Sequence, residues 1–251
     1  MPRQELVDKV PPLHGKEKQG RKPRGGLGGE VSPAQILARL EARYDIPPWQ
    51  QRLAPLEELI ACILSQHTSD VNSERAFARL KERFPRWQEV IDAPTDEIAD
   101  AIRCGGLADS KAPRIQEVLR RIEADRGRIS LDFLETLPDA EARAYLMSLP
   151  GVGPKTAAIV LCFALGRPVI PVDTHVFRVA WRLGLIEKRI GEAKAHDALQ
   201  ALVPEDRVYP FHVALIMHGR QVCKAPVPRC EICPLTDLCR YFQEERQKQQ
   251  V

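Results

Sequence analysis

Lys155 and Asp173 are the residues of this sequence best suited to covalent chemistry. Lys155 falls in the first turn of a helix predicted to run to Leu165, where the helix dipole disfavours a cation. With partial burial, this field is expected to lower the pKa of the lysine and leave part of it as the free amine that a nucleophile needs. Gly166 and two prolines then end the helix and turn the chain back, so that Asp173, eighteen residues further on, can return beside Lys155.

Asp173 also has a second, purely structural interpretation. Asp173-Thr174 precedes an apolar helical run and has the form of a helix N-cap, a position that aspartate favours. Capping alone would explain an aspartate here, so the sequence leaves both roles open.

The segment Leu149-Pro150-Gly151-Val152-Gly153 separates two apolar helical runs and predicts a very short turn between helices. Its two glycines permit positive φ angles and close approach of another backbone. The amides that open the second helix are unpaired donors at the positive end of the dipole, which together form a seat for an anion such as phosphate. A tight helical hairpin that serves packing alone is the alternative.

Four of the seven cysteines, Cys223, Cys230, Cys233 and Cys239, are spaced C-x6-C-x2-C-x5-C. Four thiolates in so short a segment can surround one metal site, and the spacing suits either zinc or an iron–sulfur cluster. Basic residues near them, among them Lys224 and Arg229, predict a surface for phosphates, although an ordinary solvated run of charges would look the same.

The elements that position these residues are predicted to be helices. Apolar side chains recur at helical spacing from Ser32-Pro33 onward, and a core helix starts at Pro55. A helix from Thr95 is expected to stop at Gly105-Gly106, and the next to run from Ser110 to Gly127. Convincing strand-like alternation is absent from the sequence, so we predict an all-α protein of many short helices.

Length and composition narrow the class of protein. The 251 residues suffice for one large or two small domains, and the net charge of +3 does not by itself indicate a nucleic-acid partner. No apolar stretch reaches the length of a membrane span and no signal-peptide core follows Met1, so we expect a cytoplasmic protein without membrane contact. Residues 1–30 are basic, rich in glycine and without apolar periodicity, which predicts a disordered tail.

Taken together, LPGVGPKTA and the later VDTHVFR resemble the helix-hairpin-helix and Gly/Pro-Asp signature of the endonuclease III family of DNA repair glycosylases. The resemblance implies a two-lobed fold: a helical lobe at residues 55–167, and a second lobe made of residues 31–54 and 168–251. It also favours a 4Fe-4S cluster over zinc on the four cysteines. The expected partner is damaged double-stranded DNA, so we expect a nucleoid-associated protein. Action as a monomer is the simplest expectation.

The resemblance also extends to two loops that open the duplex in this family. An enzyme that attacks the sugar of a paired nucleotide must extrude it and fill the gap, usually with an apolar wedge and a polar side chain. Leu107 falls at the wedge position. His67 stands where many members carry glutamine, and Gln66 precedes it, so the sequence leaves open which of the two enters the duplex.

The resulting hypothesis is a glycosylase with lyase activity on oxidised pyrimidines. The amine of Lys155 attacks the sugar as the base leaves, forms a Schiff base and permits β-elimination, while Asp173 stabilises positive charge on the sugar. Two alternatives are a non-catalytic module that binds damaged DNA and a monofunctional mismatch glycosylase. The presence of both Lys155 and Asp173 argues against the first, since phosphate binding does not require them together.

Overall fold

A computed structural model describes residues 31–249, and within this range all regular elements are helices. The all-α prediction is thereby confirmed, whereas the tail predicted at residues 1–30 lies outside the described residues. The first elements are α1 (Pro33–Glu41), α2 (Pro55–Ser65), α3 (Asp70–Arg83), α4 (Trp87–Asp92), α5 (Thr95–Ile102), η1 (Arg103–Gly105) and α6 (Ala108–Arg126). They are followed by η2 (Asp132–Thr136), α7 (Asp139–Ser148), α8 (Pro154–Ile159) and η3 (Val160–Ala164).

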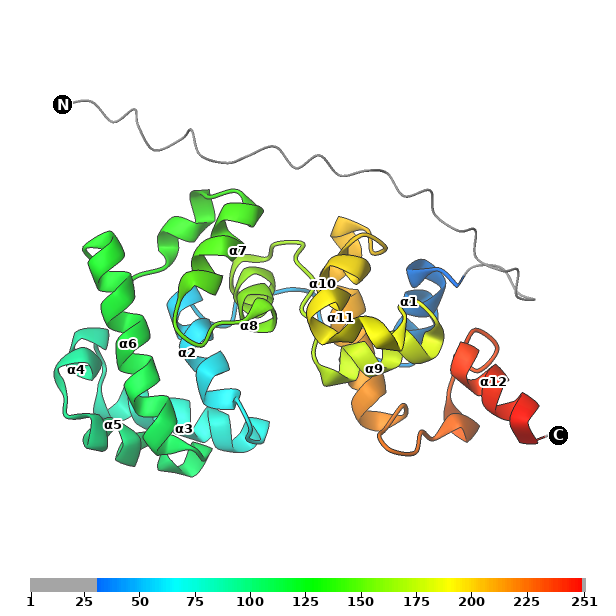
Figure 1. The fold of residues 1–251 in the computed structure, drawn as a ribbon, viewed down its shortest axis with the longest axis horizontal. Coiled ribbons are helices and arrows are strands. Elements are labelled where there is room, and N and C mark those ends of the chain that lie inside the picture. Colours follow the sequence, from blue (N-terminus) through cyan, green and yellow to red (C-terminus); the bar gives the residue numbers. More distant parts are fainter. Residues whose placement is uncertain (1–30, 250–251) are drawn as a thin grey trace. The chain divides into compact units, whose positions relative to one another are not determined.

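The remaining elements form the C-terminal part of the chain (Figure 1). They are α9 (Thr174–Leu183), η4 (Lys188–Ile190), α10 (Gly191–Gln200), η5 (Glu205–Arg207), α11 (Val208–Gln221), η6 (Cys230–Ile232) and α12 (Arg240–Gln249). None of the helices in the described range combines the length and the apolar character needed to cross a membrane.

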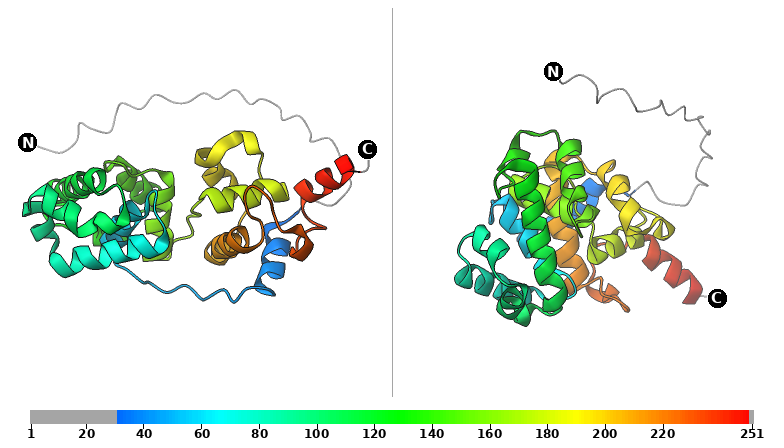
Figure 2. Two further views of the ribbon diagram at one scale, coloured as in Figure 1. Left: turned by 90° about the horizontal axis from the view of Figure 1, so that it is seen from below. Right: turned by 60° about the vertical axis from the view of Figure 1, so that its left-hand side comes forward.

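Two hydrophobic cores organise these helices. The first core is built from buried side chains between Leu56 and Leu161, on α2 to α8 and the start of η3. The second core joins α1 to buried side chains between Cys162 and Leu235. Figure 2 shows the connection from α1 to α2 as an extended segment, so the chain enters the second core first, crosses to the first core and then returns.

Local sequence signals account for most helix boundaries. Ser32 caps α1 through a reciprocal pair of hydrogen bonds with Gln35, and Pro33 occupies the first helical position. Gly127 ends α6 and Gly184 ends α9, both with positive φ, as glycine does at helix C-termini.

Two boundaries differ from the sequence prediction. Helix α6 begins at Ala108 rather than Ser110, and Leu107, with φ of 52°, takes the cap position. Ser110 lies within the first turn, where its hydroxyl donates to the carbonyl oxygen of Leu107 at 3.0 Å. The helix predicted to run regularly to Leu165 is α-helical only through Ile159 and then widens into the π-helix η3.

Candidate functional site

The turn between α7 and α8 has two glycines in different environments. Gly151 has φ of 72°, and a Cβ atom there would lie 2.7 Å from Cδ of Arg114. Gly153 is extended, with φ of −99°, and a Cβ atom there would meet nothing within 4 Å. Val152 between them is buried in the first core. Gly151 is therefore favoured by its positive φ, and an added Cβ would also displace the flexible Arg114 side chain, whereas neither constraint applies to Gly153.

Lys155 follows Pro154 in the first turn of α8, where it is exposed. The expected partial burial of this residue is therefore wrong. Its charge nevertheless affects two buried groups, because the pKa values of the Cys62 thiol and the His212 imidazole both respond to it. Further along the same helix, Ile159 lines a cavity together with Cys62 and His212.

Asp173 is buried, with 9% of its surface exposed, and forms the N-cap of α9. Its Oδ1 atom accepts a hydrogen bond from the backbone N–H of Val176 at 2.7 Å, so the capping role is confirmed. A carboxylate has several acceptor positions, and the cap uses one oxygen. The other oxygen, Oδ2, takes no part in this cap hydrogen bond.

Side-chain hydrogen bonds fix the extended segment that delivers Asp173. The N–H of Ile170 donates to Oε1 of Gln200 at 2.8 Å, and the Gln200 amide donates to the carbonyl of Pro168 at 2.7 Å. The N–H of Val172 donates to Nε2 of His196 at 3.1 Å. Both partners, Gln200 and His196, belong to α10. Side chains of α10 thus satisfy backbone groups of this extended segment, and these hydrogen bonds hold Asp173 in place.

His212 on α11 is 3% exposed and contacts this extended segment. Its Nδ1 donates to the carbonyl of Pro171 at 2.8 Å. Burial lowers the pKa of His212 to about 4, against the opposing charge of Asp173. The imidazole is therefore neutral at physiological pH. His212 thus bonds to the segment that leads to Asp173 and lines one cavity together with Ile159 of α8.

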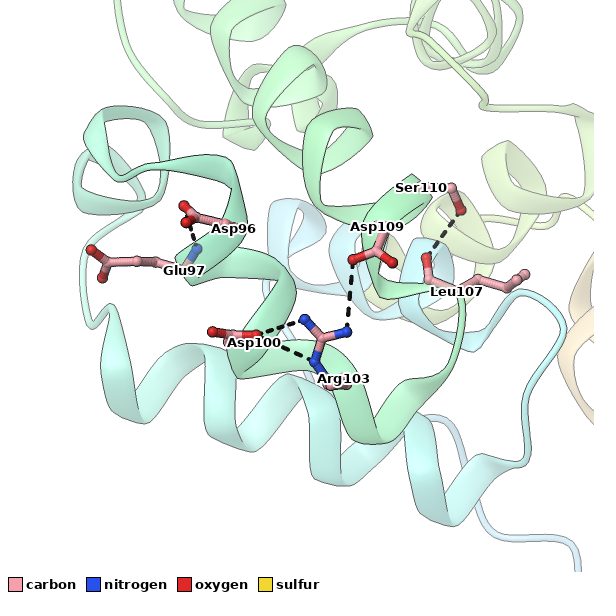
Figure 3. Close-up of polar contacts among 7 residues, drawn as sticks. All are labelled: Asp96, Glu97, Asp100, Arg103, Leu107, Asp109 and Ser110. Atoms are coloured by element: carbon pink, nitrogen blue, oxygen red, sulfur yellow. Dashed lines mark hydrogen bonds and ion pairs between the residues drawn. The ribbon is translucent and has the colours of Figure 1, made fainter.

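His67 and Leu107 share an unusual backbone conformation. Among residues 31–249 they are the non-glycine residues with positive φ, at 55° and 52° respectively. Both side chains are exposed, Leu107 to 57%. Figure 3 shows the Leu107 side chain extending from its turn, away from the ion pair of Arg103 with Asp100 and Asp109. Such left-handed conformations are strained and occur preferentially at functional sites.

Gln66 differs from its neighbour His67 in having a partner within the protein. Its Oε1 atom accepts a hydrogen bond from Nη1 of Arg114 at 3.1 Å. Arg114 also packs against Gly151, so it links this loop to the turn between α7 and α8. The sequence left open which of Gln66 and His67 points outward, and the structure has Gln66 tied to α6 and His67 exposed.

Lys111 and Arg114, both on α6, are two further residues that contact these loops and were not predicted from the sequence. Lys111 is only 2% exposed, and its Nζ donates to the carbonyl of Leu64 at 2.7 Å and to that of Gly105 at 3.0 Å. A signal for it exists in the sequence, because Lys111 falls on the apolar face of α6, three residues after Ala108. No comparable signal marks Arg114.

The four spaced cysteines line one cavity next to α9 and the end of α11. Their atoms do not form a metal-binding group of three or more ligands within the described part of the chain. The surroundings nevertheless suit an anionic cluster. Arg182 is 6% exposed, its Nη1 donates to Sγ of Cys223 at 3.3 Å, and its buried Nε has no hydrogen-bond partner among the described residues.

A second buried polar group approaches the same cavity. His218 is 1% exposed and lies between the Tyr44 hydroxyl, 3.1 Å from Nδ1, and Sγ of Cys233, 3.5 Å from Nε2. When the tyrosine donates to Nδ1, Nε2 carries the proton and can donate to sulfur, which favours a thiolate. The residues present therefore fit a metal–thiolate centre, although the cysteines are not drawn together around one point.

The basic surface predicted near the cysteines is less strongly charged than the sequence suggested. Lys224 and Arg229 are both exposed. Arg229 forms an ion pair with Glu231 at 3.7 Å, and Arg220 pairs with Asp70 at 2.8 Å. Neighbouring carboxylates thus offset part of the positive charge.

The helical fold and the turn between α7 and α8 define a class of protein. Residues 60–205 match the family model of the HhH-GPD superfamily base excision DNA repair proteins. The chain is 40% identical over 190 residues to a protein of Arabidopsis thaliana named as a DNA glycosylase, covering 72% of this chain and 64% of that protein's length. It is 38% identical over 189 residues to endonuclease III of Thermotoga maritima, covering 75% of this chain and 84% of that protein.

A solved structure agrees with these relatives. It is a trapped covalent intermediate of endonuclease III with DNA, with 33% sequence identity, a TM-score of 0.73, and coverage of 86% of this chain and 99% of that one. Within the HhH-GPD superfamily, this chain therefore belongs to the endonuclease III family.

Proposed function

We propose that this protein is a base excision repair DNA glycosylase with lyase activity at abasic sites, and that it removes oxidised pyrimidines from duplex DNA. The observation that carries the proposal is that a chain of the endonuclease III family has an exposed Lys155 in the first turn of α8 and a buried, hydrogen-bonded Asp173 at the N-cap of α9. An amine at the surface and a carboxylate held in a fixed orientation are the two groups that the reaction requires.

In the proposed mechanism, the amine of Lys155 is the nucleophile and the negative charge of the Asp173 carboxylate stabilises the sugar as it becomes positively charged. The amine attacks C1′ of the extruded nucleotide as the base departs, and the resulting Schiff base permits β-elimination of the 3′ phosphate. Oδ1 of Asp173 holds the cap hydrogen bond to Val176, which leaves Oδ2 to stabilise positive charge on the sugar. Capping and catalysis are thus compatible roles of one side chain, because the cap fixes the orientation of the carboxylate.

The DNA contacts follow from the turns on either side of this site. We propose that the turn Gly151-Val152-Gly153 binds a phosphate of the damaged strand through the amides of its two glycines, because the N–H of Val152 already donates to the carbonyl oxygen of Leu149 at 3.2 Å. Leu107 and His67 enter the duplex, since both are exposed on strained turns, and Gln66 supports His67 from within the loop through Arg114. Lys224 and Arg229 add phosphate contacts near the cysteine segment.

The four cysteines are proposed to hold a 4Fe-4S cluster. Cys223, Cys230, Cys233 and Cys239 supply the thiolates, and the buried guanidinium of Arg182 offsets their negative charge. Bound there, the cluster would supply a structural link between the ends of the second core. Iron and acid-labile sulfide assays on the purified protein test this assignment. Zinc in place of iron, or no metal, would contradict it.

The two hydrophobic cores support a division into the predicted lobes, residues 55–167 and residues 31–54 with 168–251. We further propose that the protein acts as a monomer in the cytoplasm, associated with the nucleoid.

A trapping experiment tests the catalytic assignment. Duplexes that contain thymine glycol or an abasic site are incubated with the protein and borohydride, which reduces a Schiff base to a stable covalent bond. The wild type is expected to form a covalent band with both duplexes and to cut the strand. Lys155→Gln is expected to form none, while Lys194→Gln, a change at an exposed lysine of α10, is expected to behave as the wild type.

The outcomes separate the alternatives. A Lys155→Gln protein that still forms the covalent band would refute the nucleophile assignment. A wild type that binds damaged duplex tightly but forms no band would favour a monofunctional glycosylase or a binding module.

A further inference from the structure

A cavity of about 670 Å³ lies where the first core meets the second. Helices α2 and α3 and the π-helix η3 form one side of it, and α11 forms the other. Its lining includes Glu58 and Cys62 of α2, Phe163 of η3, and His212 and Met217 of α11. A volume of this size is in the range of pockets that accept small organic molecules.

Glu58 is the unusual member of this lining. It is only 9% exposed, and among residues 31–249 its carboxyl group forms no ion pair. Its Oε1 atom faces the thiol of Cys62 at 3.9 Å, a weak donor. Burial raises the pKa of Glu58, and the positive charge of Arg52, which lines the same cavity, together with the thiol counteracts this only in part. A buried carboxyl group without a cation is costly unless it is protonated or has a ligand to contact.

The cavity adjoins α8, the helix that carries the proposed nucleophile, because its lining residue Ile159 lies about one helical turn after Lys155. His212, which also lines the cavity, donates a hydrogen bond to the carbonyl oxygen of Pro171, two residues before Asp173. A nucleotide whose C1′ reaches the Lys155 amine must place its base somewhere, and this cavity is adjacent and large enough.

We propose that this cavity receives the extruded base and that Glu58 contacts the base as a neutral acid and protonates it as it leaves. The inference rests on the proposed function and adds a catalytic residue to it. The glycosidic C1′–N bond breaks, and its electron pair goes to the base. The Lys155 amine forms the new N–C1′ bond, the Glu58 proton passes to the base, and solvent later reprotonates the resulting carboxylate.

This role gives base excision and strand cleavage different requirements. Excision of a base needs an acid for the leaving group, whereas cleavage at an abasic site has no base to release. Glu58 is therefore required for the first reaction only, and Lys155 for both.

The pH dependence has a defined sign. The neutral acid persists below the pKa of Glu58, so the excision step slows as the pH rises through that value. Other titratable or charged groups face the same region and are present in all variants, namely Arg52 before α2, Cys62 of α2, Asp70 and Glu74 of α3, Lys155 of α8, and Tyr209, His212 and Arg220 of α11. If Glu58 causes the fall in excision rate at high pH, that fall must therefore be absent from a variant in which only Glu58 is changed.

Glu58→Gln tests the proposal, since glutamine keeps the shape and can hydrogen-bond but cannot transfer a proton. Single-turnover excision is measured on duplexes with thymine glycol and with dihydrouracil, and strand cleavage with borohydride trapping on an abasic duplex. Excision is expected to fall about 100-fold or more, in line with general acid catalysis, while abasic cleavage stays unchanged. Glu57→Gln, next in sequence and paired with Lys81, is the matched control.

Each outcome decides the proposal. Unchanged excision by Glu58→Gln, or an equal loss of excision and abasic cleavage, would overturn it. Glu58→Asp is expected to recover part of the excision rate and the descending limb of the pH profile. A wild type that does not trap on the abasic duplex refutes the proposed function itself. A wild-type protein that cuts the abasic duplex but excises neither thymine glycol nor dihydrouracil would refute both the proposed substrate class and the proposed role of Glu58.

Discussion

The buried amine of Lys111 donates a hydrogen bond to the carbonyl oxygen of Leu64 at 2.7 Å. Leu64 lies just before the loop that carries His67. The same amine reaches the carbonyl of Gly105, at the start of the turn that carries Leu107. One side chain thus joins the backbones behind both residues proposed to enter the duplex.

Lys111→Met is accordingly expected to affect folding and binding together. It leaves two buried carbonyls without their donor, and hydrogen bonds to a charged group are worth about 1.5–3 kcal/mol each, offset in part because the charge no longer has to be buried. We expect a lower thermal midpoint and weaker binding to a duplex with a stable abasic-site analogue. Lys194→Met, at an exposed position, serves as control. A variant with unchanged duplex affinity would contradict the link between the loops.

Replacement of Leu107 by glycine should separate stability from function. Glycine adopts positive φ without strain, which relieves on the order of 1 kcal/mol, and the exposed side chain contributes little to the core. The thermal midpoint is expected to stay the same or rise, while affinity for damaged duplex falls. Val71→Gly changes an exposed residue in the first turn of α3 and should lower the thermal midpoint without weakening binding to damaged duplex, because glycine destabilises a helix. Undiminished affinity of Leu107→Gly would exclude a wedge role.

His67→Ala tests the second residue proposed to enter the duplex. Binding to damaged duplex is expected to weaken, and the preference among the four opposite bases to change, as measured by titration of four duplexes. Gln66→Ala should act differently, because it removes the hydrogen bond to Arg114 and loosens the loop without a direct contact to DNA. Unchanged affinity and unchanged preference in His67→Ala would remove this residue from the interface.

The two glycines of the hairpin turn offer a matched pair for mutation. Gly151→Ala forces a Cβ to 2.7 Å from Cδ of Arg114 at a φ of 72°, so a loss of roughly 1–2 kcal/mol in unfolding free energy is expected. Gly153→Ala meets nothing within 4 Å at an extended backbone and should be close to neutral. Denaturation midpoints of the two variants provide the comparison. Equal losses of stability in the two variants would contradict the different conformations of Gly151 and Gly153.

The neutral state of His212 predicts a stability change with pH. Its pKa is about 4 in the folded protein and near 6.5 when unfolded, so the unfolded chain binds the extra proton between these values. Its contribution is present above pH 6.5 and is lost as the pH falls toward 4, by about 3 kcal/mol at most. His212→Asn keeps a donor for the Pro171 carbonyl and removes the titration. Thermal midpoints between pH 7 and 4.5 should fall less steeply in this variant than in the wild type.

Local rules predicted the features that depend on few residues. Ser32-Pro33 opens α1, Gly166 follows the hairpin's second helix with φ of 64°, and the cap at Asp173 precedes α9. The turn at Gly151 is equally local. Each of these follows from the conformational range of a single residue or from one cap hydrogen bond.

The remaining features depend on packing between distant segments. The widening of the helix into η3 was not predicted, because the apolar spacing of residues 156–165 suits a regular α-helix and π-helical turns are rare. The burial of Glu58 requires α11, whose residues come some 150 positions later. Lys155 is exposed because α8 begins at the protein surface. The spacing of apolar residues within α8 does not indicate whether its first turn is buried.

The placement of α1 in the second core has a consequence for biosynthesis. Its apolar residues Ile36, Leu37 and Leu40 are buried against segments from Cys162 to Leu235, and Arg39 pairs with Asp237. A growing chain therefore exposes α1 to the ribosome exit and the cytosol while the whole first core is made and can fold. The earliest of these helices to emerge is thus among the last to find its partners, and its apolar face stays uncovered until the second core is synthesised.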